Sequence, residues 1–365
     1  FFTSWRFIGF FDNLLYILAM TRNTRRVTFY GFVAVFVFAT PLTILYTLGY
    51  SFDWQKLSLM QTGGIYLKST PGGAHIVLND KKNGTTPKLI SRLLPKEFTI
   101  TVGKDGFYDW NKKLEVSAGL VSEARNIFLF PKTIKPELRA QNATSTIAEY
   151  LSPISEKQKL QQARNTASTT PAWAFKNDNI FYLNQNLVLF RSDLNSIFKE
   201  QLSKEGLPPG SYRIITNNSG SRVAVLNYNG DLYLLSAEGI FEKIGDGMKD
   251  AKFSSDSKKL LMLSDNEINV LYLNDILIQP YKKAGDKELI TRYSQTISDA
   301  IFYPNNEYVA FVVGDQVKVI ELDGRDHRNT IDLMTAKSPQ IYFDQNNDYF
   351  YYLAENNLYR FKIES

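Results

Sequence analysis

The chain has 365 residues, of which 44% are hydrophobic and 14% aromatic, so it is long and apolar enough for two or three packed domains. Its net charge of +5 is unevenly spread: residues 1–26 hold four arginines and one aspartate, a net of +3, which leaves +2 for the rest. Such a weak charge excludes the basic footprint of a nucleic-acid-binding protein. The absence of cysteine excludes disulfides, thiolate zinc sites and cysteine nucleophiles.

An uncharged segment at residues 27–50 dominates the N-terminal region. As a helix it would reach about 36 Å, enough to cross a hydrocarbon core of about 30 Å. Three arginines between positions 22 and 26 precede it, so the positive-inside rule predicts that residues 1–26 are cytoplasmic. Everything after Tyr50 is then extracytoplasmic, and the protein is a single-pass membrane protein. Since large exported eukaryotic domains usually carry disulfides, the lack of cysteine favours a bacterial envelope.

The first residues are open to two interpretations. The chain begins with Phe1, whereas Met20 starts a stretch suited to a membrane anchor, so residues 1–19 are expected to be an extension of the gene start. The alternative is a second, short membrane segment at residues 7–20, which is marginal because it carries Asp12. Both interpretations leave the main domains outside the cytoplasm.

Short apolar runs alternate with turn signals over residues 63–132. This pattern predicts a small β-sandwich of about 70 residues. The predicted strands begin at Ile65, His75, Phe98, Lys113 and Asn126, and the turns contain Pro71-Gly72-Gly73, Asn83-Gly84, Asp105-Gly106 and Ala118-Gly119.

Several motifs in this region follow one another in the order of a known family. Residues 69–74 (Ser-Thr-Pro-Gly-Gly-Ala), residues 79–87 ending in Gly-Thr-Thr-Pro, and the Gly106-Phe107 corner resemble the PEGA domain, with Gly72 in place of the family's Glu. The resemblance implies an extracytoplasmic β-sandwich of the kind found in bacterial and archaeal surface proteins. Elementary geometry gives the Pro-Gly-Gly-Ala motif a structural role, because it combines a fixed φ, two flexible residues and a small side chain at a tight turn.

Two aromatic residues next to this corner are the candidate ligand contacts. Strand alternation places Tyr108 and Trp110 on one face and Phe107 on the other. If that face is exposed, the two rings form a flat platform that stacks on sugar rings. The alternative is that the face belongs to a second core or to an interface with the next domain.

Residues 133–170 change character and are predicted to be a linker, because they are rich in Ser, Thr, Asn and Pro and poor in large apolar residues. Within them Ser155-Glu156-Lys157-Gln158 has the form of a capping box. A short polar helix over residues 156–167 is therefore expected.

Residues 171–365 repeat a strand-turn-strand pattern with a period of roughly 40 residues, which is typical of a β-propeller. Phe253–Leu261 and Leu322–Asp326 resemble the repeat of TolB-like propellers. Five repeat units can be identified in the sequence. A sixth would have to lie in the linker or within residues 277–296. The five units align on Ala174-Phe175, Ile214-Ile215, Lys252-Phe253, Ile301-Phe302 and Ile341-Tyr342-Phe343.

The motifs of common catalytic sites are not found. The only histidines, His75 and His327, fall in different predicted domains, and no phosphate-binding loop occurs. The sequence therefore predicts no catalytic, cofactor or metal site. It predicts an all-β ectodomain, made of a small β-sandwich and propeller-like repeats, on one N-terminal transmembrane α-helix.

The expected function is non-catalytic binding or scaffolding at the cell envelope. The expected partners are the membrane and an envelope polysaccharide or surface protein, without nucleic acid. Two alternatives remain: a hydrolase that uses the propeller face, and a sensory ectodomain for a separate signalling partner.

Overall fold

The computed structural model describes residues 21–365 apart from 55, 144–145, 345–347 and 364–365. The two interpretations of residues 1–19 and 7–20 lie outside the described residues. The chain divides into two compact units. Unit 1 contains the residues up to Ile65 with Leu89–Glu97 and Glu115–Ser122, and unit 2 contains Tyr66–Lys88, Phe98–Leu114 and Glu123–Ser365.

Helix α2 (Arg22–Thr47) opens the described chain and belongs to unit 1. It begins five residues before the predicted segment, because the Thr21 hydroxyl accepts a hydrogen bond from the Thr24 N–H and so caps the arginine-rich turn. It ends earlier than predicted, since Gly49 has a φ of +82° and the chain turns into a strand at Tyr50. In the part of the chain that the structure describes, one helix, α2, is long and apolar enough to cross a membrane.

A hairpin and two small sheets follow α2. The hairpin pairs β1 with β2, and the sheets have the orders β6-β3-β9 and β5-β4-β7-β8. The predicted β-sandwich is present. The strands are β1 (Tyr50–Asp53), β2 (Ser58–Gln61), β3 (Gly63–Thr70), β4 (His75–Leu78), β5 (Lys81–Thr85), β6 (Lys88–Leu93), β7 (Glu97–Gly103), β8 (Trp110–Glu115) and β9 (Val121–Phe128).

The Pro-Gly-Gly-Ala motif forms a turn that is tied to the Gly-Thr-Thr-Pro motif. The Thr86 hydroxyl lies 2.6 Å from the Ser69 hydroxyl and accepts a hydrogen bond from the Ala74 N–H at 3.1 Å. Gly73 has a φ of +71°, and its N–H donates to the Thr86 carbonyl. Ala74 is fully buried beneath the turn. The motif therefore holds two turns together, as its small and flexible residues predict.

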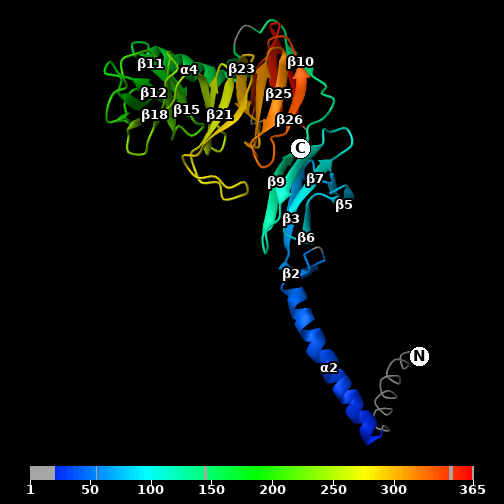
Figure 1. The fold of residues 1–365 in the computed structure, drawn as a ribbon. Helices are drawn as coiled ribbons and strands as arrows, with labels where there is room; N and C mark the ends of the chain where they lie inside the picture. Colours follow the sequence, from blue (N-terminus) through cyan, green and yellow to red (C-terminus); the bar gives the residue numbers. More distant parts are fainter. Residues whose placement is uncertain (1–20, 55, 144–145, 345–347, 364–365) are drawn as a thin grey trace, which may run out of the picture. The chain divides into compact units, whose positions relative to one another are not determined.

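Five four-stranded antiparallel sheets make up the rest of unit 2, and they are the predicted propeller blades (Figure 1). Blade 1 is β11 (Ala172–Lys176), β12 (Asn179–Leu183), β13 (Leu189–Asp193) and β14 (Lys199–Gln201). Blade 2 is β15 (Tyr212–Thr216), β16 (Val223–Asn227), β17 (Leu232–Leu235) and β18 (Phe241–Gly245). Blade 3 is β19 (Met248–Phe253), β20 (Lys259–Ser264), β21 (Glu267–Tyr272) and β22 (Lys287–Arg292). Blade 4 is β23 (Ile297–Phe302), β24 (Tyr308–Val313), β25 (Gln316–Glu321) and β26 (Thr330–Thr335). Blade 5 is β27 (Gln340–Asp344), β28 (Tyr349–Ala354), β29 (Asn357–Lys362) and β10 (Glu137–Ala140).

The first strand of each blade is its inner strand, because successive first strands contact one another from β11 through β15 and β19 and from β23 to β27. Every repeat anchor predicted from the sequence falls on one of these inner strands. The second and third strands of blades 3 and 4 are almost continuously buried, since neighbouring blades cover both of their faces. The long spacing before blade 4 comes from a loop between β21 and β22, closed by a bridge between Ile276 and Lys282, and not from a sixth blade.

The segment predicted to be a linker supplies part of the propeller. Strand β10 pairs antiparallel with β29 and completes blade 5 as its outer strand. The sequence concealed it because Glu137–Ala140 is only four residues long, too short for its alternation to stand out, and none of its residues is fully buried. Blade 5 therefore combines a strand from before the repeats with three strands from the C-terminal end.

Two short helices in the same segment cover the outer faces of the first and last blades. Helix α3 (Ile147–Leu151) packs through Ile147 on Tyr351 and Leu358 of blade 5. Helix α4 (Ile154–Thr166) packs through Ala163 on Ile180 of blade 1. Its N-cap is Pro153 without a side-chain hydrogen bond, so the predicted capping box does not form. The segment from α3 to α4 thus packs on both the last and the first blade.

This covering role predicts a sharp difference between two isoleucines of the segment. Ile147→Ala should lower the free energy of unfolding by about 2–5 kcal/mol, because it leaves a cavity against blade 5. Ile154→Ala, at an exposed position, should change it by less than about 0.5 kcal/mol. Urea denaturation of the full chain in detergent measures both. Equal effects would show that α3 does not stabilise blade 5.

Candidate functional site

A buried lysine marks the first candidate site, on sandwich strand β8. Burial alternates along this strand, so Trp110, Lys112 and Leu114 all point to the covered face. The Lys112 side chain is fully buried, and its Nζ lies 2.5 Å from Oε1 of Glu321, at the end of β25 in blade 4. It also donates a hydrogen bond of 2.7 Å to the Asp323 carbonyl. A buried ammonium needs such partners, because it loses its hydration.

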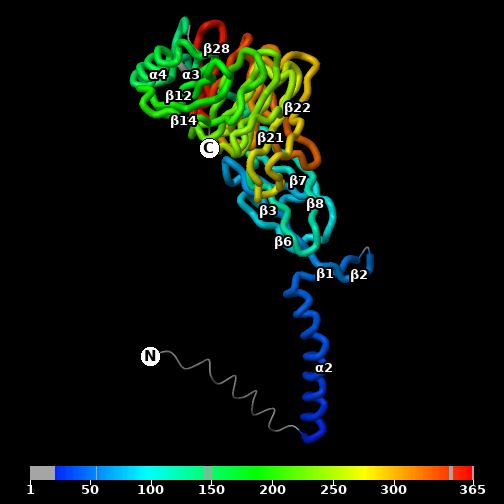
Figure 2. Tube along the Cα trace, turned by 90° about the vertical axis from the view of Figure 1, so that its left-hand side faces the viewer, coloured from blue at the N-terminus to red at the C-terminus, as the bar shows by residue number. Residues whose placement is uncertain are grey.

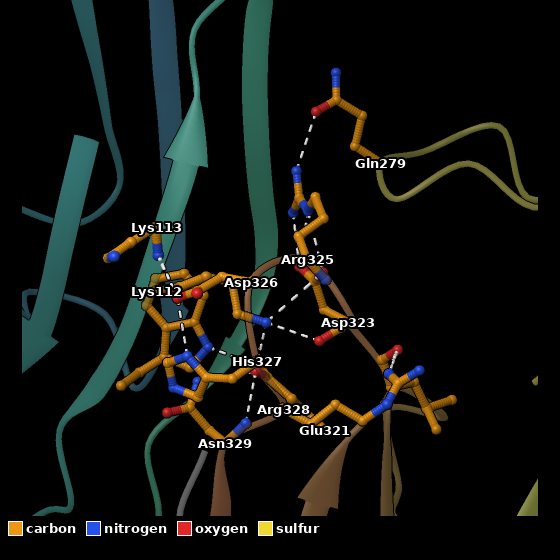
Figure 3. Close-up of polar contacts among 12 residues, drawn as sticks. Lys112, Lys113, Gln279, Glu321, Asp323, Arg325, Asp326, His327, Arg328 and Asn329 are labelled. Atoms are coloured by element: carbon orange, nitrogen blue, oxygen red, sulfur yellow. Dashed lines mark hydrogen bonds and ion pairs between the residues drawn. The ribbon is translucent and has the colours of Figure 1, made fainter. Parts of the chain in front are cut away.

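The Glu321 carboxylate is the centre of this cluster (Figure 3). Besides Lys112, it accepts hydrogen bonds from Trp110 Nε1 at 2.8 Å and from the backbone and side-chain N–H groups of Asn329, both at 2.8 Å. The Asn329 amide donates in turn to the Asn111 carbonyl at 3.0 Å. The buried charges on the two strands are therefore matched and hydrogen-bonded, the condition under which a buried ion pair is tolerated.

Arg325 extends the cluster from the loop between β25 and β26. Its guanidinium binds the Asp323 carboxylate at 2.6 Å and the Glu123 carbonyl of β9 at 2.8 Å. It also donates to Gln279 of the long blade 3 loop at 3.2 Å. Burial alone would raise the pKa of Asp323, but the hydrogen bond from Arg325 and the charges of Lys112 and Arg325 together lower it. Asp323 is thus held ionised as part of the cluster.

An aromatic core lies beside these charges. Phe128, the last residue of β9, and Phe130 pack against Tyr303 and Tyr308 of blade 4 with ring centroids 5.1–6.4 Å apart. The Tyr308 hydroxyl accepts a hydrogen bond from the Phe128 N–H at 3.0 Å, and burial raises its pKa well above the ordinary value. This part of the sandwich and blade 4 therefore share one core.

The predicted aromatic platform is wrong for this structure. Trp110 is only 3% exposed, and its indole N–H is used by Glu321. Tyr108 is half-buried against the core that contains Phe128 and Phe130, and its backbone N–H donates to the Phe130 carbonyl. The two rings are taken up by the contact with blade 4, which was the alternative left open by the sequence. Neither offers a free flat face to a sugar.

The second candidate site is an opening among the inner strands of the propeller, with a volume of about 880 Å³. Arg213 of β15, Lys252 of β19 and Asp299 of β23 line it together with the start of β27. The residues before α3 and the β24–β25 turn complete its wall. Its size falls within the range of small-molecule sites, and its lining is rich in polar groups.

Alternating charges cross this opening from blade to blade. Arg213 binds Asp250 at 2.6 Å, Asp250 lies 3.5 Å from Lys252, and Lys252 binds Asp299 at 2.7 Å. Asp299 also accepts a hydrogen bond from the Ile341 N–H at 3.1 Å, which joins the series to blade 5. The series thus links the inner strands of blades 2 to 5 around the axis.

The two sites lie at opposite ends of blade 4. Strand β25 begins at Gln316, next to Asp315 in the opening, and ends at Glu321 in the charge cluster. Six residues of strand separate the ends by about 20 Å. Strand β8 therefore binds the end of blade 4 that is remote from the opening and leaves the opening uncovered.

Sequence reasoning missed the residues of both sites, although signals for them exist. Lys112 stands between Trp110 and Leu114 in an alternating pattern, and a lysine at an apolar position indicates a buried partner. In the opening, Asp250, Lys252 and Asp299 occur in strands that the repeat alignment had placed in register. Charges of alternating sign on successive inner strands indicate ion pairs between neighbouring blades around the propeller axis. Neither signal identifies the partner residue.

The β-sandwich is similar to a known domain family. Residues 62–125 match the PEGA domain. No curated protein is similar enough to match. Three solved structures are similar to the chain at low identity. The Cps50 (Swd1) β-propeller domain of Myceliophteria thermophila is 11% identical with a TM-score of 0.34, covering 53% of this chain and 82% of its own.

The second is a gluconolactonase from Xanthomonas campestris, 15% identical with a TM-score of 0.34, covering 52% of this chain and 70% of its own. The third is an auxiliary nutrient binding protein from Bacteroides thetaiotaomicron, 8% identical with a TM-score of 0.31, covering 79% and 78%. At these TM-scores the propeller fold rests on the five blades described above and not on the likeness.

The charge cluster predicts a large cost for removing Lys112. Lys112→Met should lower the free energy of unfolding by about 3–5 kcal/mol, because Glu321 is left buried and unpaired. Lys113→Met, at the next and exposed position of β8, should cost less than about 0.5 kcal/mol. Adding Glu321→Gln to Lys112→Met should restore part of the loss. Urea denaturation measures all three, and a neutral Lys112→Met would contradict the buried ion pair.

Proposed function

We propose that the chain is a membrane-anchored, extracytoplasmic binding or scaffold protein of the bacterial cell envelope, which recognises a glycan or a protein without chemical turnover. Helix α2, with the arginines at its N-terminal end, is the anchor, and its N-terminus faces the cytoplasm. The match of residues 62–125 to the PEGA domain supports the extracytoplasmic location. The propeller supplies the recognition surface.

The opening among the inner strands is the observation that carries this proposal. It is concave, polar and uncovered by β8, as a ligand site must be. Its exposed wall includes the hydroxyl of Ser298 and the amide of Gln340, which suit the hydroxyl groups of a sugar or the backbone of a peptide.

The carboxylates of the opening support binding over hydrolysis. Asp299 is held by Lys252 and by a backbone N–H, and Asp315 accepts a hydrogen bond from the Ser338 N–H at 2.9 Å. A glycoside hydrolase needs one protonated and one ionised carboxyl group beside the scissile bond. Both carboxylates are already bound by other groups of the chain and so help to shape the wall of the opening, as expected of a binding site.

The membrane topology gives the first test. A periplasmic-type reporter such as alkaline phosphatase, fused after Ser365, should be active, and a reporter that needs the cytoplasm should be inactive, because the arginines at the start of α2 are retained inside. Changing Arg22, Arg25 and Arg26 together to Glu should mix the two orientations. Activity of the cytoplasmic reporter in the unmodified chain would contradict the proposed location.

Blocking the opening gives the second test. The purified full chain should bind members of a glycan array or a surface protein from an envelope extract, without releasing products from glycoside or ester substrates. Ser298→Trp should weaken this binding at least about tenfold, because the indole fills the opening.

The matched control is Thr330→Trp, which adds the same side chain to an exposed position of outer strand β26 in the same blade. It should bind with unchanged affinity. Equal binding by wild type and Ser298→Trp would move recognition to another surface. Turnover of a substrate would replace the proposal by an enzyme.

A further inference from the structure

The hairpin directly after α2 carries an exposed apolar face that the sandwich and the propeller leave unused. Strands β1 and β2 pair so that Phe52 lies opposite Leu59. Trp54 follows Phe52 by two residues and packs edge-on against its ring, with centroids 4.8 Å apart. Phe52, Trp54, Leu57 and Leu59 are 41%, 81%, 73% and 47% exposed.

The hairpin is amphipathic. The opposite face carries Ser51 paired with Met60 and Asp53 paired with Ser58, and it is the more buried one, since Asp53 is only 8% exposed. The large apolar side chains thus lie on the exposed face, and a contiguous exposed apolar patch of this kind marks a contact with a membrane or another molecule. An isolated two-stranded hairpin is marginally stable in water, so an apolar environment for the exposed face would stabilise it.

The position of the hairpin specifies that environment. Tyr50 begins β1 only three residues after Thr47 ends α2, and the base of the hairpin is closed by Thr62, whose hydroxyl donates to the Gly49 carbonyl at 2.6 Å. In Figure 2 the hairpin projects sideways from the end of α2. An element that leaves the end of a membrane-spanning helix sideways runs along the membrane surface.

We propose that the apolar face of the β1–β2 hairpin binds the interface of the lipid bilayer, with Trp54 and Phe52 among the lipid headgroups and upper acyl chains. This inference rests on the proposed membrane anchorage through α2. Tryptophan is enriched at this depth, because its ring is apolar and its N–H binds polar headgroups. The hairpin then acts as a second, lateral contact beside the helix.

Cations at the same level suit this location. The guanidinium of Arg92, on β6 within unit 1, lies 3.5 Å from the centroid of the Tyr46 ring near the end of α2. Lys56 is exposed in the hairpin turn, next to Trp54 and Leu57. Positive groups beside interfacial aromatic residues attract the phosphates of lipid headgroups. The hairpin and Arg92 thereby fix the end of α2 from two sides.

The absence of cysteine from the chain allows a direct test by labelling. Trp54→Cys and, as a second position, Leu57→Cys are labelled with the fluorophore NBD in the full chain and reconstituted in phosphatidylcholine vesicles with or without nitroxide-labelled lipid. The matched control is Tyr228→Cys, at an exposed position between β16 and β17 of blade 2. Flotation of the vesicles on a density gradient reports anchorage independently.

The proposal expects that all three labelled proteins float with the vesicles. NBD at positions 54 and 57 should emit at shorter wavelength than NBD at position 228 and should lose intensity when nitroxide lipid is present. Floating protein with water-like, unquenched NBD at both hairpin positions would overturn the hairpin inference and leave the anchorage intact.

Two further outcomes are distinct. Emission at short wavelength without quenching by nitroxide lipid would show that protein, from a second copy or another chain, covers the hairpin, and would also overturn the inference. Failure of the vesicles to carry the protein would overturn the anchorage through α2 itself, and with it the inference.

Discussion

One buried charge determines how the sandwich and the propeller are joined. Lys112 points to the covered face of β8, and its ammonium has no access to water, so the strand is stable only while Glu321 and the Asp323 carbonyl remain in place. The partners come from the end of blade 4, more than two hundred residues later in the sequence. Because the same blade end also buries Phe128 and Phe130, charge and aromatic packing specify a single pairing of the two elements. An apolar contact alone would allow other registers.

The contact with β8 gives the two ends of blade 4 different roles. The end at Glu321 is occupied by β8 and β9, while the end at Asp315 borders the opening where the inner strands meet. The alternating series from Arg213 to Asp299 joins these inner strands by ion pairs and places charged groups in the wall of the opening. A ligand site that depends on several blades is thereby kept in shape by ion pairs between them. The cover of α3 and α4 over the outer faces of blades 5 and 1 serves the same purpose.

Local patterns in the sequence were sufficient to predict the helices and strands. They did not predict which of these elements pack against one another. The uncharged run before Tyr50, the turn motifs around Gly73 and the five repeat anchors each depend on neighbouring residues, and the structure has the corresponding helix, sandwich turn and inner strands. The pairing of strand β10 in blade 5 and the burial of Trp110 depend on contacts with residues far along the chain. A periodic pattern in the local sequence does not reveal such contacts. Trp110 shows the difficulty plainly: alternation placed it correctly on one face of β8, but only Glu321 decides that this face is buried. The sequence alone could have shown that a lysine at position 112 is unusual in this apolar pattern. It could not have shown that Glu321 is the partner of Lys112.

The buried ion pair and the shared aromatic core should make β8 and blade 4 unfold as one cooperative body. Native-state hydrogen exchange, measured over a series of urea concentrations, tests it most directly, because it gives the opening free energy of each amide. Protected amides of β8, and of β25 and β26, should exchange with the same free energy and the same dependence on urea. Amides of β8 that exchange at a clearly lower free energy than those of blade 4 would contradict it.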